Sequence, residues 1–388
     1  MGRSLALCLA QQRLRVGLVS APSAPAASPI PDATGPASAR PVDNRAYALN
    51  AASRQLLQDL RCWPEGASVT PVAAMHVWGD DGGVLNFSAA GAATQPVAAE
   101  ALAWIVDVAE LEASLDGALR FQPRIERLDA PQPAALTVVC EGRMSSTRDE
   151  FGVDFEVTPY GQQAIAGRLD CSKPHGGQAF QWFSGGEVMA LLPLGGPQGN
   201  AVALVWSVDE QRAQTLCALA PEDFAGQVQA ASASVLGEMT LSGGLSRWPL
   251  QQAMARRWSG TDVNGKAWVL AGDAAHTVHP LGGQGLNLGL ADAAELAAVL
   301  GSRDYWRSVG DARLLRRYER ARRSGLAPVG AVMDGLQRLF AAEEAPLKRL
   351  RNLGMQGVER SASLKAWVVR QAMGVRTHAE RTGAAGSA

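Results

Sequence analysis

The residues best suited to chemistry follow an apolar run at 267–271, where Gly272-Asp273 opens a glycine-rich stretch. An Asp at the end of a strand can accept hydrogen bonds from a ribose or polyol hydroxyl. The glycines that follow let the backbone approach a flat ligand closely, and they include Gly282, Gly283 and Gly285. The stretch predicts a ligand site, although the same residues could form an Asp turn and a helix entry with no ligand.

A helix is predicted over 286–300, directly after these glycines. The first amides of a helix have no partner within the helix and carry partial positive charge, which favours an anion. Here they would belong to Gly285, Leu286 and Asn287.

Other catalytic arrangements are not indicated. His276 and His279 have the spacing of a metal pair, but no carboxylate or Cys stands at ligand spacing, so we predict no metal site. The five cysteines form no C-x-x-C pair and are typical of reduced thiols in a cytosolic protein. No Ser-His-Asp or Cys-His arrangement suggests a side-chain nucleophile.

Composition narrows the class of protein. The 388 residues are 47% hydrophobic and 19% charged, as in a globular enzyme, and the net charge of −1 gives no reason to expect nucleic acid as a partner. No apolar run approaches the length of a membrane span. Residues 311–376 hold 14 Lys and Arg against 6 Asp and Glu. We therefore predict a cytoplasmic protein that contacts the inner membrane face or a biosynthetic complex through 311–376.

The elements that must position the site predict an α/β fold. Short apolar runs at 14–19 and 267–271 are typical of buried parallel strands, and a helix is predicted over 4–12. Between 162 and 208, strand-like runs alternate with Gly and Pro turns, which favours an antiparallel sheet. The order predicts a nucleotide-binding domain interrupted by a substrate domain, with helices from 311 onward.

The stretch Gly272-Asp273-Ala-Ala-His276-Thr-Val-His279-Pro280, continuing through Gly-Gln-Gly285-Leu-Asn287, resembles the second flavin motif of the class A flavoprotein monooxygenases. It is most similar to the ubiquinone-biosynthesis hydroxylases. The resemblance implies that Gly272 and Asp273 hold the ribityl chain of FAD. It also implies that the backbone at Gly283, Gly285, Leu286 and Asn287 faces the flavin C2 carbonyl, with Pro280 beside the ring; Pro280 and Gly285 are the catalytic positions.

The N-terminal residues resemble the part of the family's first motif that follows two phosphate-binding glycines. Gly2 aligns with the last glycine of G-x-G-x-x-G, so we expect a chain truncated after its first strand that holds FAD weakly. Arg13 stands where the family has glycine, and Ser20 where an acid binds the adenosine ribose.

Three further segments extend the resemblance. Arg45 is implied as a contact to the phosphate or ribose region of FAD. Gly142 and Arg148 belong to a motif shared between FAD and NAD(P)H binding, in which Glu141 replaces Asp. Glu112 stands where a neutral amide usually meets the pyrophosphate, in a helix that the resemblance extends back to 105.

The resemblance implies a Rossmann-like FAD domain of the glutathione-reductase type over 1–72, 104–160 and 263–305. The substrate domain is predicted over 73–103 and 161–262, with a mixed or antiparallel sheet, and 306–388 as C-terminal helices. The implied reaction is hydroxylation of an aromatic ring, a polyprenylated phenol or quinol of ubiquinone biosynthesis, by FAD, NAD(P)H and O₂. Two alternatives stay open: a flavin-poor relative that binds the lipid intermediate or scaffolds a complex, and a hydroxylase of a non-quinone phenol.

Overall fold

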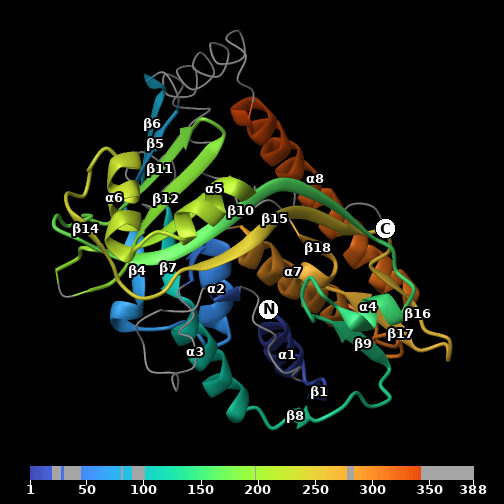
Figure 1. Ribbon diagram of the computed structural model, residues 1–388. Helices are drawn as coiled ribbons and strands as arrows, with labels where there is room; N and C mark the ends of the chain where they lie inside the picture. The colour runs from blue at the N-terminus through green and yellow to red at the C-terminus, as the bar shows by residue number, and fades with distance from the viewer. Residues whose placement is uncertain are drawn as a thin grey trace.

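The computed structural model describes residues 1–19, 28–29, 45–79, 82–89, 101–196, 198–277 and 284–341. For 28–29 and 327–341 it describes the backbone alone. Within these ranges the chain forms an α/β fold in which short parallel strands and helices lie below and to the right of a large sheet (Figure 1).

Parallel pairing occurs in two small groups of strands, and it also joins β5 (Ala74–Trp78) to β11 (Gln178–Ser184) in the large sheet. In the first, β1 (Val16–Val19) pairs with β8 (Ile125–Leu128). In the second, β17 (Ala267–Leu270) lies between β9 (Leu136–Val139), which is parallel to it, and the antiparallel β16 (Ser259–Thr261). All four residues of β17 are buried, as expected of a strand covered on both faces.

Helices pack around these strands. Ser4 to Ala10 are all buried in α1 (Gly2–Gln11), which lies against α3 (Val108–Arg120) and α7 (Gly285–Gly301). The long α8 (Ala312–Ala341) packs against α7 and runs from this part of the molecule to its upper edge (Figure 1). The short α4 (Ser146–Glu150) follows β9.

Three further strands form a small antiparallel sheet, in the order β3 (Ala46–Leu49), β7 (Ala103–Asp107) and β4 (Val69–Val72). A single 3-10 turn, η1 (Gly66–Ser68), precedes β4, and α2 (Ala51–Asp59) follows β3 directly. The helix that the family resemblance extended back to 105 begins at Val108. Ile105 and Val106 lie in β7 instead. Both side chains are buried there, and their β-branched shape suits a strand.

The largest sheet has ten strands. Its main path runs through β18 (His276–Thr277), β15 (Ser246–Ala255), β10 (Phe155–Cys171), β13 (Ala201–Asp209), β12 (Glu187–Pro193), β11 (Gln178–Ser184), β5 (Ala74–Trp78) and β6 (Val84–Ser88). Off this path, β14 (Met239–Leu241) pairs with β10 and β2 (Ser28–Pro29) with β15. One face packs against α5 (Glu210–Cys217) and α6 (Pro221–Ala231) around Trp206 and Phe224.

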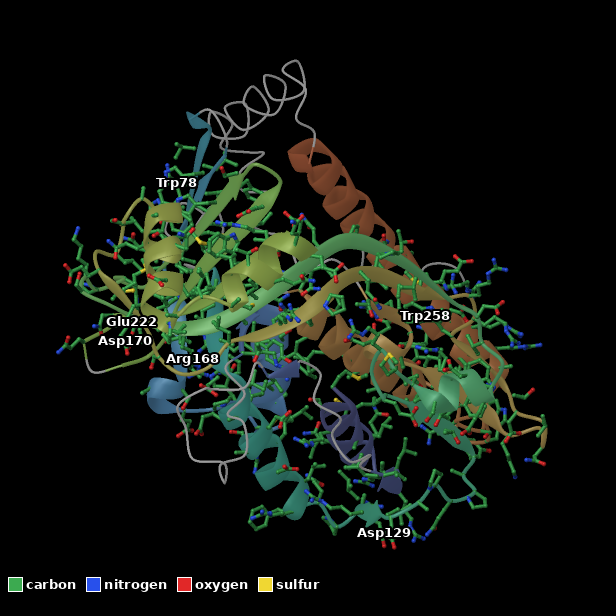
Figure 2. All side chains as sticks on the ribbon, viewed as in Figure 1. Trp78, Asp129, Arg168, Asp170, Glu222 and Trp258 are labelled. Carbon is green, nitrogen blue, oxygen red and sulfur yellow. The ribbon has the colours of Figure 1, made fainter. Side chains whose placement is uncertain are left out.

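The predicted α/β class with an antiparallel-rich sheet is confirmed. The domain boundaries stay predictions, and β10 runs across the one proposed at 160. With β15 it forms a long ribbon that extends from the large sheet to the α8 side of the molecule (Figure 1). Trp258 follows this ribbon and lies beside α8, far from Trp78 at the opposite end of the sheet (Figure 2).

The largest core cluster surrounds β17 and α7. It contains the fully buried Trp258, Trp268 and Tyr318. Burying an aromatic side chain of this size contributes roughly 1.5–3 kcal/mol. These three side chains therefore stabilise the part of the fold around β17 and α7. Among the described helices, none is long and apolar enough to cross a membrane.

Candidate functional site

The Gly272-Asp273 turn begins where β17 ends. The Ala271 amide donates to Val139 O at 3.0 Å and so prolongs the pairing with β9. Gly272 then adopts a φ of +63°, in the left-handed region that other residues rarely enter. A Cβ at this position would also lie 2.6 Å from Met1 Cε. The backbone conformation therefore favours glycine here, whereas the Met1 side chain could move to make room.

Asp292 of α7 fixes the position of this turn through hydrogen bonds. Its fully buried carboxylate accepts hydrogen bonds from the Gly272 amide and His276 Nε2, both at 2.7 Å, and from Arg322 Nε at 2.5 Å. Burial alone would raise the pKa of Asp292, but His276 and Arg322 outweigh it and hold the pKa below its ordinary value. One carboxylate thus fixes the end of β17, α7 and α8 relative to each other.

Asp273 occupies a different environment. Its side chain is accessible to solvent, yet protein atoms surround it densely enough that desolvation raises the pKa of its carboxyl, although His276 and Arg143 act against this. No described residue donates a hydrogen bond to it. An accessible acceptor without such a partner is what a ligand hydroxyl group requires.

The N-terminus of α7 lies against the same turn. Gly289 of its first turns would bring a Cβ to 3.8 Å from Gly272 Cα. The side chain of its N-cap residue, Gln284, accepts from Asn287 Nδ2 at 3.4 Å but makes no capping hydrogen bond to the backbone amides of the first turn. The first amides, predicted to face a ligand, therefore have no side-chain cap among the described residues.

The Asn287 side chain anchors this helix end to α2 and β3. Its Oδ1 accepts from the Asn50 amide at 3.0 Å and from Ser53 Oγ at 2.7 Å. Its Nδ2 donates to Ala48 O at 2.8 Å. Arg45 lies just before β3, so it belongs to a segment hydrogen-bonded to the start of α7. The segment that follows Arg45 and the start of α7, which are distant in the sequence, are thus joined by hydrogen bonds.

The segment 141–148 lies largely at the surface, and only Ser145 and Arg148 are buried in it. Gly142 has a φ of +83°. Burial would raise the pKa of Glu141, but hydrogen bonds from Thr147 and Ser145 lower it. Arg148 is buried, donates to Arg143 O at 3.0 Å and lies 3.8 Å from the Phe155 ring centre. Its guanidinium therefore stabilises this loop, and its role in cofactor binding stays a prediction.

Of the remaining predicted residues, the structure describes some and leaves others outside the described ranges. Gly2 begins α1 where a Cβ would lie 3.0 Å from Cys140 Cβ, the close helix-to-strand approach expected of a third glycine. Glu112 is more than half exposed and lies 3.9 Å from Arg3. Pro280 and Gly283 lie outside the described residues, as does Ser20.

Sequence reasoning missed the residues that hold the site in place. Asp292 and Arg322 were given no role, and neither were Asn50 and Ser53. The available signal was Asp292 itself, since an acidic residue on the buried face of an Ala- and Leu-rich helix needs charged or hydrogen-bonding partners.

Comparison with solved structures places the class of the fold. The p-nitrophenol 4-monooxygenase PnpA of Pseudomonas putida matches with a TM-score of 0.69 and 16% identity, over 97% of this chain and 96% of that one. At this identity the match shows a shared fold. The chain shares this fold also with pqsL of Pseudomonas aeruginosa, described as a probable FAD-dependent monooxygenase, at a TM-score of 0.67 and 19% identity, over 92% of this chain and 96% of that one.

Sequence comparison gives the family. Residues 122–329, more than half of the chain, match the family model described as an FAD binding domain, and the chain belongs to that family. The ubiquinone hydroxylase UbiL of Rhodospirillum rubrum is 34% identical over 242 residues, which are 62% of this chain and about half, 54%, of that protein. The 3-demethoxyubiquinol 3-hydroxylase of Escherichia coli is 28% identical over 97% of this chain and 96% of its own length.

The residues present fit FAD. Asp273 offers an accessible acceptor for the ribityl chain, and the uncapped start of α7 offers amide donors beside it. Gly272, which directly precedes Asp273, has a left-handed backbone and no side chain that could cover it. The predicted flavin assignment for this part of the site is therefore consistent with its geometry.

Proposed function

We propose that the chain is an FAD-dependent hydroxylase of an aromatic ring, acting on a polyprenylated phenol or quinol of ubiquinone biosynthesis. One observation carries the proposal: Asp273 is accessible and accepts no hydrogen bond from a described residue, and it lies near the N-terminus of α7, in a chain of an FAD-binding family. The names of the two relatives, a ubiquinone hydroxylase and a 3-demethoxyubiquinol 3-hydroxylase, support the substrate class.

The side chains would bind and orient, and none would form a bond with the substrate. Asp273 would accept hydrogen bonds from the ribityl chain, and the first amides of α7 would favour negative charge at the flavin carbonyl. Asp292 and Asn287 would keep these two groups in register through the contacts that they make to Gly272 and to α2. Bound FAD supplies the redox chemistry, by which one atom of O₂ enters the ring and the other leaves as water.

NAD(P)H is proposed as the reductant because the overall reaction needs two electrons and two protons in addition to O₂, and NAD(P)H supplies both electrons and one of the protons as a hydride. The balance is one NAD(P)H, one proton, one O₂ and one phenol giving NAD(P)⁺, water and the hydroxylated ring. Gly142 and Arg148 are the proposed contacts to the cofactors in 141–148.

The basic region 311–376 supports a peripheral contact with an anionic membrane face or with an acidic partner of the pathway. A polyprenylated substrate resides in the bilayer, so an enzyme that acts on it must approach the headgroups. Of this region, 342–376 lies outside the described residues.

The test is incubation of the purified chain with FAD, NADH or NADPH, a short-chain prenyl phenol and isotopically labelled O₂, followed by mass spectrometry. We expect one labelled oxygen atom in the product, and much less labelled product with Asp273→Asn at an FAD concentration near the wild-type Kd. A chain that binds FAD and oxidises NAD(P)H without labelling any prenyl phenol would refute the proposed substrate class.

A further inference from the structure

Away from the flavin site, a groove lies between the N-terminal half of α8 and the end of β15. Its volume is about 560 Å³, within the range of small-molecule sites. The lining consists of five arginines and one acid: Arg256, Arg313, Arg316, Arg320, Arg323 and Glu319. No residue of the proposed flavin site belongs to it.

The fold fixes the direction in which α8 presents its arginines. The opposite face of the helix is buried: Tyr318 donates to Leu270 O at 3.2 Å, and Arg322 binds Asp292. Residues spaced three and four apart share one face of a helix. Because Tyr318 and Arg322 hold one face of α8 against the core, Arg313, Arg316 and Arg320 lie on the exposed face of the helix.

Two of the five arginines in the groove already have acidic partners. Glu319 accepts a hydrogen bond from Ser259 Oγ at 3.1 Å and forms an ion pair with Arg323, whose Nε lies 3.1 Å from the Glu319 carboxylate. Arg323 also donates to Ala255 O at 2.9 Å and to Arg256 O at 2.6 Å. The Arg256 guanidinium pairs with Glu156 at 2.6 Å. These contacts tie the two walls of the groove together and neutralise two of the five arginines.

Three arginines are left over. Within the described part of the chain, the side chains of Arg313, Arg316 and Arg320 have no ion pair or hydrogen bond. Like charges at this spacing on a helix repel each other. A multiply charged anion in the groove would remove the repulsion, and the planar guanidinium fork matches phosphate oxygens with two parallel hydrogen bonds.

We propose that this groove is a binding site for a phosphate-bearing anion, with Arg313, Arg316 and Arg320 as its principal ligands. The phosphate can belong to a lipid headgroup or to a soluble molecule, and the chemistry of recognition is the same. The inference deepens the proposed contact through 311–376, since these three arginines lie in that region, but it does not rest on the proposed hydroxylase activity, because no residue of the proposed flavin site lines the groove.

The experiment compares the wild-type chain with Arg316→Gln/Arg320→Gln. A matched control, Arg15→Gln/Arg120→Gln, removes the same charge from exposed positions elsewhere. Each chain is sedimented with vesicles of phosphatidylglycerol and phosphatidylcholine, and with vesicles of phosphatidylcholine alone, and is titrated with inorganic phosphate by calorimetry. FAD affinity and the unfolding temperature are measured in parallel.

We expect the groove variant to bind its phosphate ligand about thirtyfold more weakly, since each basic residue contributes about 1 kcal/mol at an anionic surface. The control should keep wild-type affinity. Binding to anionic vesicles that phosphate does not reproduce identifies a headgroup, whereas saturable binding of phosphate identifies a soluble ligand, and either supports the site. If the groove variant and the control bind equally, or if neither vesicles nor phosphate bind at all, the site does not exist. Because FAD affinity should stay unchanged in both variants, failure here is distinguishable from failure of the flavin assignment.

Discussion

The carboxylate of Asp292 accepts a hydrogen bond from the backbone amide of Gly272 at 2.7 Å, across 20 positions of sequence. The bond links the middle of α7 to the turn that presents Asp273. The same carboxylate binds His276 and Arg322, so the turn is held by the one buried acid that also joins α7 to α8.

Asp292→Asn should therefore destabilise the fold strongly. It leaves the Arg322 guanidinium buried without a carboxylate, and breaking a buried pair in this way costs about 3–5 kcal/mol. The control is Asp304→Asn, which removes a half-exposed partner lying 3.6 Å from Arg307 and should cost less than about 1 kcal/mol. Urea unfolding of the three chains measures both values, and equal losses in the two variants would show that the buried network has no special weight.

The same carboxylate predicts the pH dependence of stability. Its pKa is lowered in the folded protein, so its contribution is fully present above the unfolded value of about 3.9 and is lost as pH falls through the folded value. The gap in unfolding free energy between wild type and Asp292→Asn should be constant near neutrality and shrink below about pH 4. A gap that grows on acidification would contradict the lowered pKa.

Asp273 should show the opposite sign. Its pKa is raised by desolvation, so the stabilising contribution of its protonated form is present at low pH and is lost as pH rises through the folded value. At neutral pH without FAD, Asp273→Asn should unfold at the same or a higher urea concentration than wild type. A clear loss of stability would mean that the carboxylate holds the fold together and is not kept free for a ligand.

Arg13 offers a test of backbone strain. Its φ is +64° and its side chain is exposed. The left-handed conformation costs about 1–2 kcal/mol for a non-glycine residue, and glycine loses about 0.5–1 kcal/mol through its freer unfolded chain. Arg13→Gly should therefore stabilise the fold by about 0.5–1 kcal/mol. The neighbouring exposed Arg15 has no positive φ, so Arg15→Gly should destabilise it, and two changes of the same sign would contradict the argument.

Local sequence patterns were sufficient to predict the strand, turn and helix around Asp273. An apolar run, a Gly-Asp pair and an Ala-rich helix each depend on neighbouring residues, and the structure has them as β17, the turn and α7. The contacts of Asp292 could not be predicted, because they depend on Arg322, which lies on another helix 30 positions away. Arg148 shows the same limit: its motif predicts a cofactor contact, but only the fold reveals that Phe155 and the Arg143 carbonyl surround its guanidinium.

The central claim is that Asp273 and the start of α7 hold FAD, and equilibrium dialysis of the purified chain against FAD tests it most directly. We predict saturable binding of one FAD per chain. In Asp273→Asn the affinity should fall about ten- to hundredfold, the equivalent of losing about 1.5–3 kcal/mol of hydrogen bonding to a charged acceptor. Arg316→Gln/Arg320→Gln should bind FAD like the wild type. Non-saturable binding by the wild-type chain, or an unchanged Kd in Asp273→Asn, would contradict the assignment of this site.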